Sequence, residues 1–313
     1  MKRLVWPVVL SLVVAGGLRT LTGAMGDSRT VDSRTFWRLK THPGQQFDGL
    51  LVGDSRTYRG LSPTVMEPFL SGRRVHNLGY SSGRLSRDLF DHAEGLLNPE
   101  AQPPFIVLGL SAHALSKAKQ GPENPQLARY LDLGDWEQRL DLWARPLTQH
   151  VFRPLVADPT VALQMARQGE GRVRYHQRFD ERGFVASITE PVDPQRALKS
   201  YGKTLREHPV DPGVVRVLID RVARWHKAGV SVYILRLPVP AAMDDLERGL
   251  GGFDERQLRM DLARAGGHWL GLETKDLSTY DGSHLDPESA RRLSQRVAEA
   301  IATDLSLDPA PKP

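Results

Sequence analysis

The chain has 313 residues and a formal net charge of +5 at pH 7, so it can form one large α/β domain with insertions or two small domains. It contains no cysteine, which excludes disulfides, zinc–thiolate sites, a cysteine nucleophile and a lipidated cysteine. The positive charge is spread over scattered arginines. No block of five or more like charges occurs, so the sequence predicts no nucleic-acid partner.

An apolar stretch, residues 4–18, follows Lys2 and Arg3 near the start of the chain. As a helix it would be about 22 Å long, shorter than the ~30 Å hydrocarbon core of a bilayer. This pattern predicts a signal peptide over residues 1–24, or an uncleaved membrane anchor with Arg19 at the far interface. Either form predicts export to the periplasm or the cell envelope.

Residues 25–46 are polar and predict a linker, or a surface helix over 35–40. Farther along, short apolar runs predict five buried strands, at 47–53, 74–79, 104–110, 230–237 and 268–272. Helical spacing and capping residues predict helices at 62–70, 85–97, 214–228, 254–265 and 287–305. Prolines punctuate residues 111–211, which predicts a mostly helical insert in a domain spanning 47–305. The tail, 306–313, is expected to be disordered.

Strands that alternate with helices predict a parallel sheet with helices on both faces. In such sheets the functional site lies outside the carboxyl ends of the strands. Ser55, Gly79 and Ser111 all fall at predicted strand ends. The fold therefore predicts that these residues lie close together.

Ser55, in Gly53-Asp54-Ser55-Arg56, is the candidate nucleophile. A serine hydroxyl needs a base within hydrogen-bond reach and a third group that orients the base. In Asp281-Gly282-Ser283-His284, His284 is the candidate base and Asp281 the candidate orienting group. Asp281 has an alternative role as the start of an Asx turn, with His284 then on the surface. The predicted oxyanion donors are the backbone N–H groups of Ser55 and Gly79, with the N–H or hydroxyl of Ser111 as a third.

Three short segments resemble sequence blocks of the GDSL/SGNH hydrolase superfamily. Gly53-Asp54-Ser55-Arg56 is similar to its first block, Asn77-Leu78-Gly79 to its second and Asp281-Gly282-Ser283-His284 to its last. The resemblance spans residues 47–305 apart from the insert. It implies a three-layer, flavodoxin-like fold and serine-based esterase or acyltransferase chemistry. We expect a five-stranded sheet from the strand pattern, and no cofactor or metal. An exported member of this kind resembles the envelope proteins of polysaccharide O-acetylation and D-alanyl transfer.

The sequence departs from the family pattern in three places. The family's third block normally reads Gly-x-Asn-Asp, whereas this chain has Ser111 and Ala112 there. Leu285 stands in place of the usual proline after the histidine, and Arg56 in place of the leucine after the serine. Because the asparagine normally helps to hold the oxyanion, its loss removes a donor unless Ser111 replaces it.

Several other residues allow two interpretations of their role. Arg56, Arg59 and Arg84 either line an anionic pocket or form a solvated face. The aromatic side chains of the insert either pack helices or stack on a sugar; these are Tyr130, Trp136 and Trp143. Asp54 is expected to be structural, and His76 and His113 to be ordinary polar residues, since no metal-ligand spacing is present.

The sequence thus favours an exported serine esterase or acyltransferase that acts on an acylated cell-envelope glycan or a similar ester. The alternative is a catalytically weak or inactive member that binds glycans or serves as a scaffold in an envelope assembly. A third possibility is an intracellular lipase whose N-terminus has been misread. Possible membrane association would involve residues 4–18.

Overall fold

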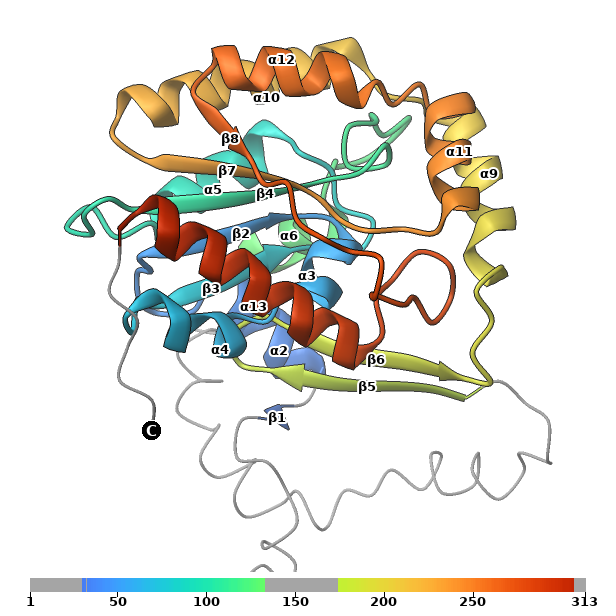
Figure 1. Cartoon of the computed structure of the whole chain (residues 1–313), viewed down its shortest axis with the longest axis horizontal. Helices are drawn as coiled ribbons and strands as arrows, with labels where there is room; N and C mark the ends of the chain where they lie inside the picture. The colour runs from blue at the N-terminus through green and yellow to red at the C-terminus, as the bar shows by residue number, and fades with distance from the viewer. Residues whose placement is uncertain (1–29, 32, 133–173, 307–313) are drawn as a thin grey trace, which may run out of the picture. The chain divides into compact units, whose positions relative to one another are not determined.

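The computed structural model describes residues 30–31, 33–132 and 174–306. Its main sheet has five parallel strands in the spatial order β3-β2-β4-β7-β8, which confirms the predicted α/β class (Figure 1). Counted within this sheet alone, the strands run 2-1-3-4-5, the order of flavodoxin-like folds. The order changes direction between β2 and β4. A ligand crevice is therefore expected at the carboxyl ends of those two strands.

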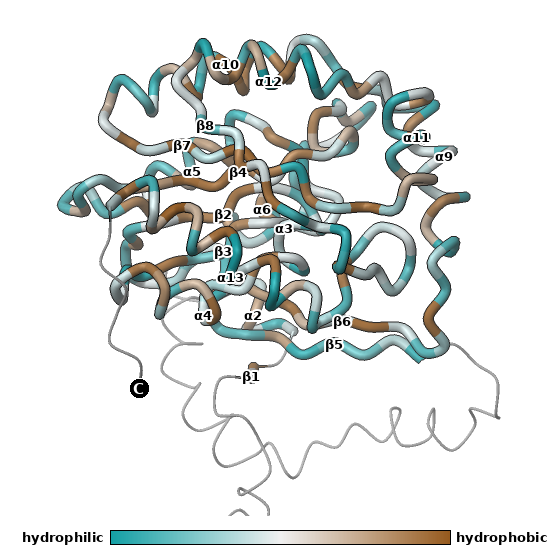
Figure 2. The backbone as a smooth tube through the Cα atoms, in the orientation of Figure 1, coloured by the Kyte–Doolittle hydropathy of each residue, from teal (hydrophilic) through white to brown (hydrophobic). Residues whose placement is uncertain are grey.

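All five predicted strands are present, although the last one is shorter than expected. They are β2 (Gly49–Gly53), β3 (Val75–Gly79), β4 (Phe105–Leu110), β7 (Ser231–Arg236) and β8 (Gly267–Trp269). The first three are buried along their whole length, because helices cover both faces of the sheet. Figure 2 shows the apolar residues gathered along these central strands.

The strands divide their side chains between two cores. In β4, Ile106 and Leu108 belong to one apolar cluster, whereas Phe105 and Val107 belong to the cluster on the other face. The first face is covered by α5 (Arg87–Leu96), α10 (Pro212–Lys227) and α12 (Glu255–Arg264). The second is covered by α4 (Pro63–Met66), the 3-10 helix η2 (Glu67–Leu70) and α13 (Pro287–Asp304). The fold is thus the predicted three-layer sandwich.

Local sequence explains where the helices begin. Five helices start at a residue whose side chain accepts a hydrogen bond from a backbone amide of the first turn, which is the usual N-cap interaction. These N-caps are Asp54, Ser86, Asp211, Asp254 and Asp286. Proline follows the cap in α10 and α13, where its fixed φ favours the helix and no amide hydrogen is needed.

The helix offered as one alternative for residues 35–40 is present, but it is packed against the protein and does not lie on the surface. Helix α2 (Ser33–Thr41) buries Phe36 and Leu39 in a small cluster with Tyr58 and Val185. Lys40, also buried, donates hydrogen bonds to the carbonyls of Asn77 (2.6 Å) and Gly183 (2.7 Å). Most residues of this segment are polar, but its few apolar residues lie on one face of the helix. The overall polar composition therefore did not predict that this helix is packed.

The described part of the insert contains a β-hairpin as well as helices, and residues 133–173 of it lie outside the described residues. Its described part includes helix α6 (Pro125–Leu131), the antiparallel hairpin of β5 (Arg174–Asp180) and β6 (Val185–Glu190), and helix α9 (Arg196–Glu207). With β1 (Thr30–Val31), the hairpin forms a second sheet in the order β1-β5-β6. Helix α11 (Ala241–Gly249) was not predicted.

Some predictions concern residues that the structure does not describe. The signal peptide or anchor at residues 1–24, the tail beyond Ser306, and Trp136 and Trp143 lie outside the described residues. Across 30–31, 33–132 and 174–306, no helix has the length and apolar character needed to span a bilayer.

Candidate active site

Helix α3 (Ser55–Gly60) leaves the carboxyl end of β2 and carries Ser55 at its first position. Asp54 caps it, since its Oδ1 accepts a hydrogen bond from the Arg56 amide at 2.9 Å. The helix packs tightly on the sheet. A Cβ atom added to Gly53 or Gly109 would lie 2.1 Å from Thr57 Oγ1. Gly53 is therefore needed for this close approach.

The turn before α13 holds the other two members of the predicted triad. Gly282 has a φ of +84°, and a Cβ there would lie 1.9 Å from the Pro194 carbonyl oxygen, so only glycine fits. Asp281 Oδ1 accepts hydrogen bonds from the amides of Ser283 (2.9 Å) and His284 (2.8 Å). Asp281 thus forms the Asx turn that the sequence offered as an alternative, but His284 is buried, not on the surface.

The structure brings all three residues of the predicted triad together. Ser55 Oγ lies 2.8 Å from His284 Nε2, although 229 positions separate the two residues. His284 Nδ1 lies 2.8 Å from Asp281 Oδ2. Because a carboxylate only accepts hydrogen bonds, Nδ1 carries the proton and Nε2 is free to accept the serine hydroxyl. Figure 1 shows α3 near the start of α13, and these two helices are in contact.

The electrostatics suit a neutral histidine beside an ionised aspartate. Burial lowers the pKa of His284, and the charge of Arg59 lowers it further, against the hydrogen bond and charge of Asp281. Burial raises the pKa of Asp281, but the hydrogen bond from His284 and the backbone amides outweigh burial, so the net shift is downward. At neutral pH this arrangement can take a proton from Ser55.

Two of the predicted oxyanion donors, the Gly79 amide and the Ser111 hydroxyl, already donate hydrogen bonds within the protein. The Gly79 amide donates to Asn77 Oδ1 at 2.8 Å, and the Ser111 hydroxyl donates to Asp54 Oδ2 at 2.6 Å. Both hydrogens are therefore used within the protein, and the role of these groups as oxyanion donors, like that of the Ser111 N–H, stays a prediction. The Ser55 amide begins α3, so it has no acceptor within its helix.

Asn77 explains the engagement of Gly79. This buried residue of β3 donates its two amide hydrogens to the carbonyls of Thr57 (2.9 Å) and Leu61 (2.7 Å) at the end of α3. Its Oδ1 accepts the Gly79 amide. Asn77 therefore fixes the nucleophile helix to the neighbouring strand, a role that the sequence did not indicate.

The three arginines differ in their surroundings. Arg56 is buried and lies 2.8 Å from Glu247 Oε1, while its Nε donates to Ser283 Oγ at 3.0 Å. Arg84 lies 3.7 Å from Glu123 Oε2. Arg56 therefore forms neither a solvated face nor an anion pocket. Arg59 is half-buried beside the triad.

The remaining polar residues have structural contacts. His76 is buried with Nε2 3.1 Å from the Lys40 carbonyl, and burial lowers its pKa to about 3. Burial also lowers the pKa of His113. Tyr130 lies in α6, and its carbonyl oxygen is 2.8 Å from His42 Nε2. In the described part of the chain, no three histidine or carboxylate side chains gather as a metal site would require.

Two residues beside the site were not identified from the sequence. Tyr280 stacks on the His284 ring with centroids 5.9 Å apart, and its hydroxyl lies 3.0 Å from Ser187 Oγ in the hairpin. Its position directly before Asp281 was the only available signal. Glu247, the partner of Arg56, belongs to a helix that no pattern predicted.

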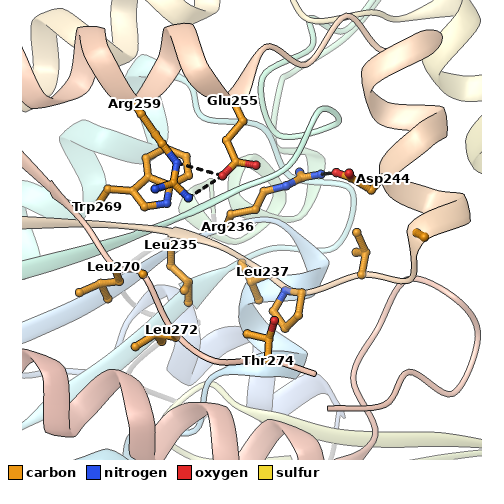
Figure 3. Close-up of a pocket in the computed structure, with 14 residues that line it drawn as sticks. Leu235, Arg236, Leu237, Asp244, Glu255, Arg259, Trp269, Leu270, Leu272 and Thr274 are labelled. Carbon is orange, nitrogen blue, oxygen red and sulfur yellow. Dashed lines mark hydrogen bonds and ion pairs between the residues drawn. The ribbon is translucent and has the colours of Figure 1, made fainter. Parts of the chain in front are cut away.

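A cavity of about 420 Å³ lies beyond the ends of β7 and β8, and none of the triad residues lines it (Figure 3). Its charged residues are paired with one another. Arg259 lies 2.7 Å from Glu255, and Arg236 lies 3.1 Å from Asp244. This cavity is therefore separate from the candidate active site and offers no unpaired charge to a ligand.

The sheet, all parallel with interleaved helices, is an α/β fold compatible with the SGNH resemblance. Comparisons of the chain with protein-family models, with curated proteins and with solved structures find no match. Membership of that superfamily is therefore a proposal.

Proposed function

We propose that the chain is an SGNH-type serine esterase or acyltransferase with Ser55 as nucleophile, His284 as base and Asp281 as orienting group. One observation carries the proposal: the continuous hydrogen-bonded row from Ser55 Oγ through His284 to Asp281, with both distances at 2.8 Å. An isolated serine–histidine contact would be a common buried interaction. The third group and the lowered pKa of His284 favour a catalytic arrangement.

The proposed reaction has two balanced steps. Ser55 Oγ attacks the ester carbonyl carbon while His284 Nε2 takes the hydroxyl proton, and the C–O bond to the alcohol breaks as the alcohol leaves with that proton. Water or a sugar hydroxyl then attacks the acyl-serine and gives its proton to His284. The bond to Ser55 Oγ breaks, and Ser55 regains a proton. The product is a carboxylic acid or a new ester.

The substrate and location are part of the same proposal. An acylated cell-envelope glycan fits an exported protein, and the expectation of export rests on residues 1–24 alone. Envelope-assembly partners and membrane association through residues 4–18 belong to this proposal too. Mass spectrometry of fractionated cells tests it. An intact Met1 peptide in a cytosolic fraction would favour the intracellular alternative.

A fluorophosphonate probe tests the chemistry. We expect the full chain to be labelled at Ser55, and Ser55→Ala and His284→Ala to lose labelling and the hydrolysis of short p-nitrophenyl esters. Ser116→Ala, a buried serine outside the triad, is the matched control and should keep both. A folded wild-type protein that neither reacts with the probe nor hydrolyses any ester would overturn the proposal. Efficient transfer to a sugar alongside slow hydrolysis would identify the acyltransferase.

A second candidate function follows from the oxyanion donors. Because the Gly79 amide and the Ser111 hydroxyl are both engaged within the protein, the site has fewer free donors than the chemistry usually needs. This favours, as the alternative, an inactive SGNH-like protein that binds glycans or serves as a scaffold. Glycan binding that is unchanged in Ser55→Ala and His284→Ala, without any labelling of the wild type, would support it.

A further inference from the structure

Arg59 differs from the other two arginines near the nucleophile. Arg56 is paired with Glu247 and Arg84 with Glu123. Within residues 30–31, 33–132 and 174–306, no carboxylate lies within the 4.0 Å of an ion pair with Arg59. Its Nε is buried and has no hydrogen-bond partner there. Burying an N–H donor of a cation without an acceptor is unfavourable, so Arg59 is suited to an acceptor that a ligand supplies.

Arg59 is also placed to reach the reacting atoms. It follows Ser55 by four positions on α3, so the two side chains leave the same face of the helix, with Cβ atoms about 5–6 Å apart. Among the charges that act on His284, that of Arg59 has the largest effect on its pKa. The guanidinium thus lies on the triad side of α3.

Tyrosines form the walls around this guanidinium. Its carbon lies 5.0 Å from the centre of the Tyr58 ring and 5.8 Å from that of Tyr175. Tyr175 is 46% exposed and lies 6.5 Å from Tyr280, which in turn stacks on His284. The row from Arg59 through Tyr175 and Tyr280 to His284 joins the guanidinium to the triad and is open to solvent at Tyr175.

We propose that Arg59 binds an anionic group of the substrate, a carboxylate or a phosphate, one helical turn from Ser55. This inference rests on the proposed function and names its substrate class: esters that carry a negative charge near the scissile bond. The planar guanidinium can donate two parallel hydrogen bonds to such a group. The faces of Tyr58 and Tyr175 attract the guanidinium and help to hold it beside the triad.

The first experiment compares two esters that differ in one charge, mono-p-nitrophenyl adipate and its neutral methyl ester. We expect wild type to prefer the anionic ester in kcat/KM. A hydrogen bond to a charged group contributes about tenfold to a hundredfold, so Arg59→Gln should reduce the preference by that factor. Arg59→Lys keeps the positive charge but loses the two parallel N–H donors of the guanidinium, so it should retain part of the preference for the anionic ester. Arg291→Gln, an exposed arginine of α13 paired with Glu288, is the control and should leave it unchanged.

A preference that is the same in wild type and Arg59→Gln would overturn the inference while leaving the proposed function intact. If no ester is hydrolysed, the proposed function fails, and binding then decides the inference. In Ser55→Ala, monomethyl adipate should raise the melting temperature and dimethyl adipate should not. Adding Arg59→Gln should abolish that rise, and Arg59→Lys should keep part of it. Equal shifts with both compounds would refute an anion site at Arg59.

Discussion

Arg56 Nη1 lies 2.8 Å from Glu247 Oε1, and the two side chains are only 1% and 0% exposed. The residue next to the candidate nucleophile is thus held by a carboxylate from α11, which also pairs with Arg236. Arg56 further donates to Ser283, the neighbour of His284. One buried network therefore connects the serine turn with the histidine turn.

We expect Glu247→Gln to destabilise the protein by about 3–5 kcal/mol, because removing one partner of a buried ion pair leaves Arg56 uncompensated, although Arg236 keeps its pair with Asp244. Urea unfolding measures this loss. Glu288→Gln, which breaks the exposed pair with Arg291, is the matched control and should change the free energy of unfolding by less than about 1 kcal/mol. A loss for Glu247→Gln as small as that of the control would show that the network does not stabilise the site.

The pH dependence of Ser55 reactivity should follow His284, which must be neutral to accept the serine proton. Burial and the charge of Arg59 lower the pKa of His284 from its usual value of 6.5. The rate of fluorophosphonate labelling should therefore rise with pH, with the midpoint of the rise below pH 6.5. Arg59→Gln removes a positive charge, so it should move this rise to higher pH, and Arg291→Gln should not. A labelling profile that is the same in wild type and Arg59→Gln would contradict the role of Arg59.

The same shift has a consequence for stability. A histidine whose pKa is lower in the folded state binds protons better when unfolded. Its contribution to stability is therefore fully present above pH ~6.5 and is lost as the pH falls towards the folded-state pKa. His284→Asn should flatten this part of the curve of unfolding free energy against pH.

Much of the fold followed from local patterns. The apolar runs that became β2 to β4 are buried on both sides, and Asp286 with Pro287 marks the start of α13 by capping chemistry alone. The triad could be proposed because its residues stand at strand ends and before the last helix. Their distances depend on how α3 and α13 pack, which no local pattern determines.

The parts that the sequence did not predict depend on long-range partners. Arg56 looked like a surface or anion-binding residue because its partner Glu247 lies far along the chain in an unpredicted helix. Ser111 and Gly79 stand where donors are expected, but Asp54 and Asn77 take up their hydrogens. Only three-dimensional contacts show which polar groups are already satisfied.

The packing of α3 on the sheet gives a further prediction. A methyl group at Gly109 would lie 2.1 Å from Thr57 Oγ1, so Gly109→Ala should destabilise the protein by about 1–3 kcal/mol through overpacking. Thr57→Ala removes the nearest colliding atom but leaves Leu237 Cδ1 at 2.7 Å, so the double variant should recover part of the loss in urea unfolding. Gly95→Ala is the control. A Cβ there meets nothing within 4 Å, so this helix substitution should be neutral or stabilising by up to about 1 kcal/mol. Additive losses in the double variant would contradict this account of the packing.

Replacing Ser111 distinguishes two hypotheses about its hydroxyl: that it holds the oxyanion, or that it stabilises the fold through Asp54. If its hydroxyl held the oxyanion, Ser111→Ala would reduce Ser55 acylation by ~10²–10³-fold with little effect on stability. Because the hydroxyl donates to the buried Asp54 at 2.6 Å, we expect the converse. Unfolding free energy should fall by about 1–3 kcal/mol, because Asp54 loses a donor, while the labelling rate falls less than about tenfold. Ser116→Ala, in a buried serine that does not contact Asp54, should leave the labelling rate unchanged. A hundredfold slower labelling of a Ser111→Ala protein as stable as wild type would return Ser111 to the oxyanion hole. It would also mean that the hydroxyl turns from Asp54 to the substrate during the reaction.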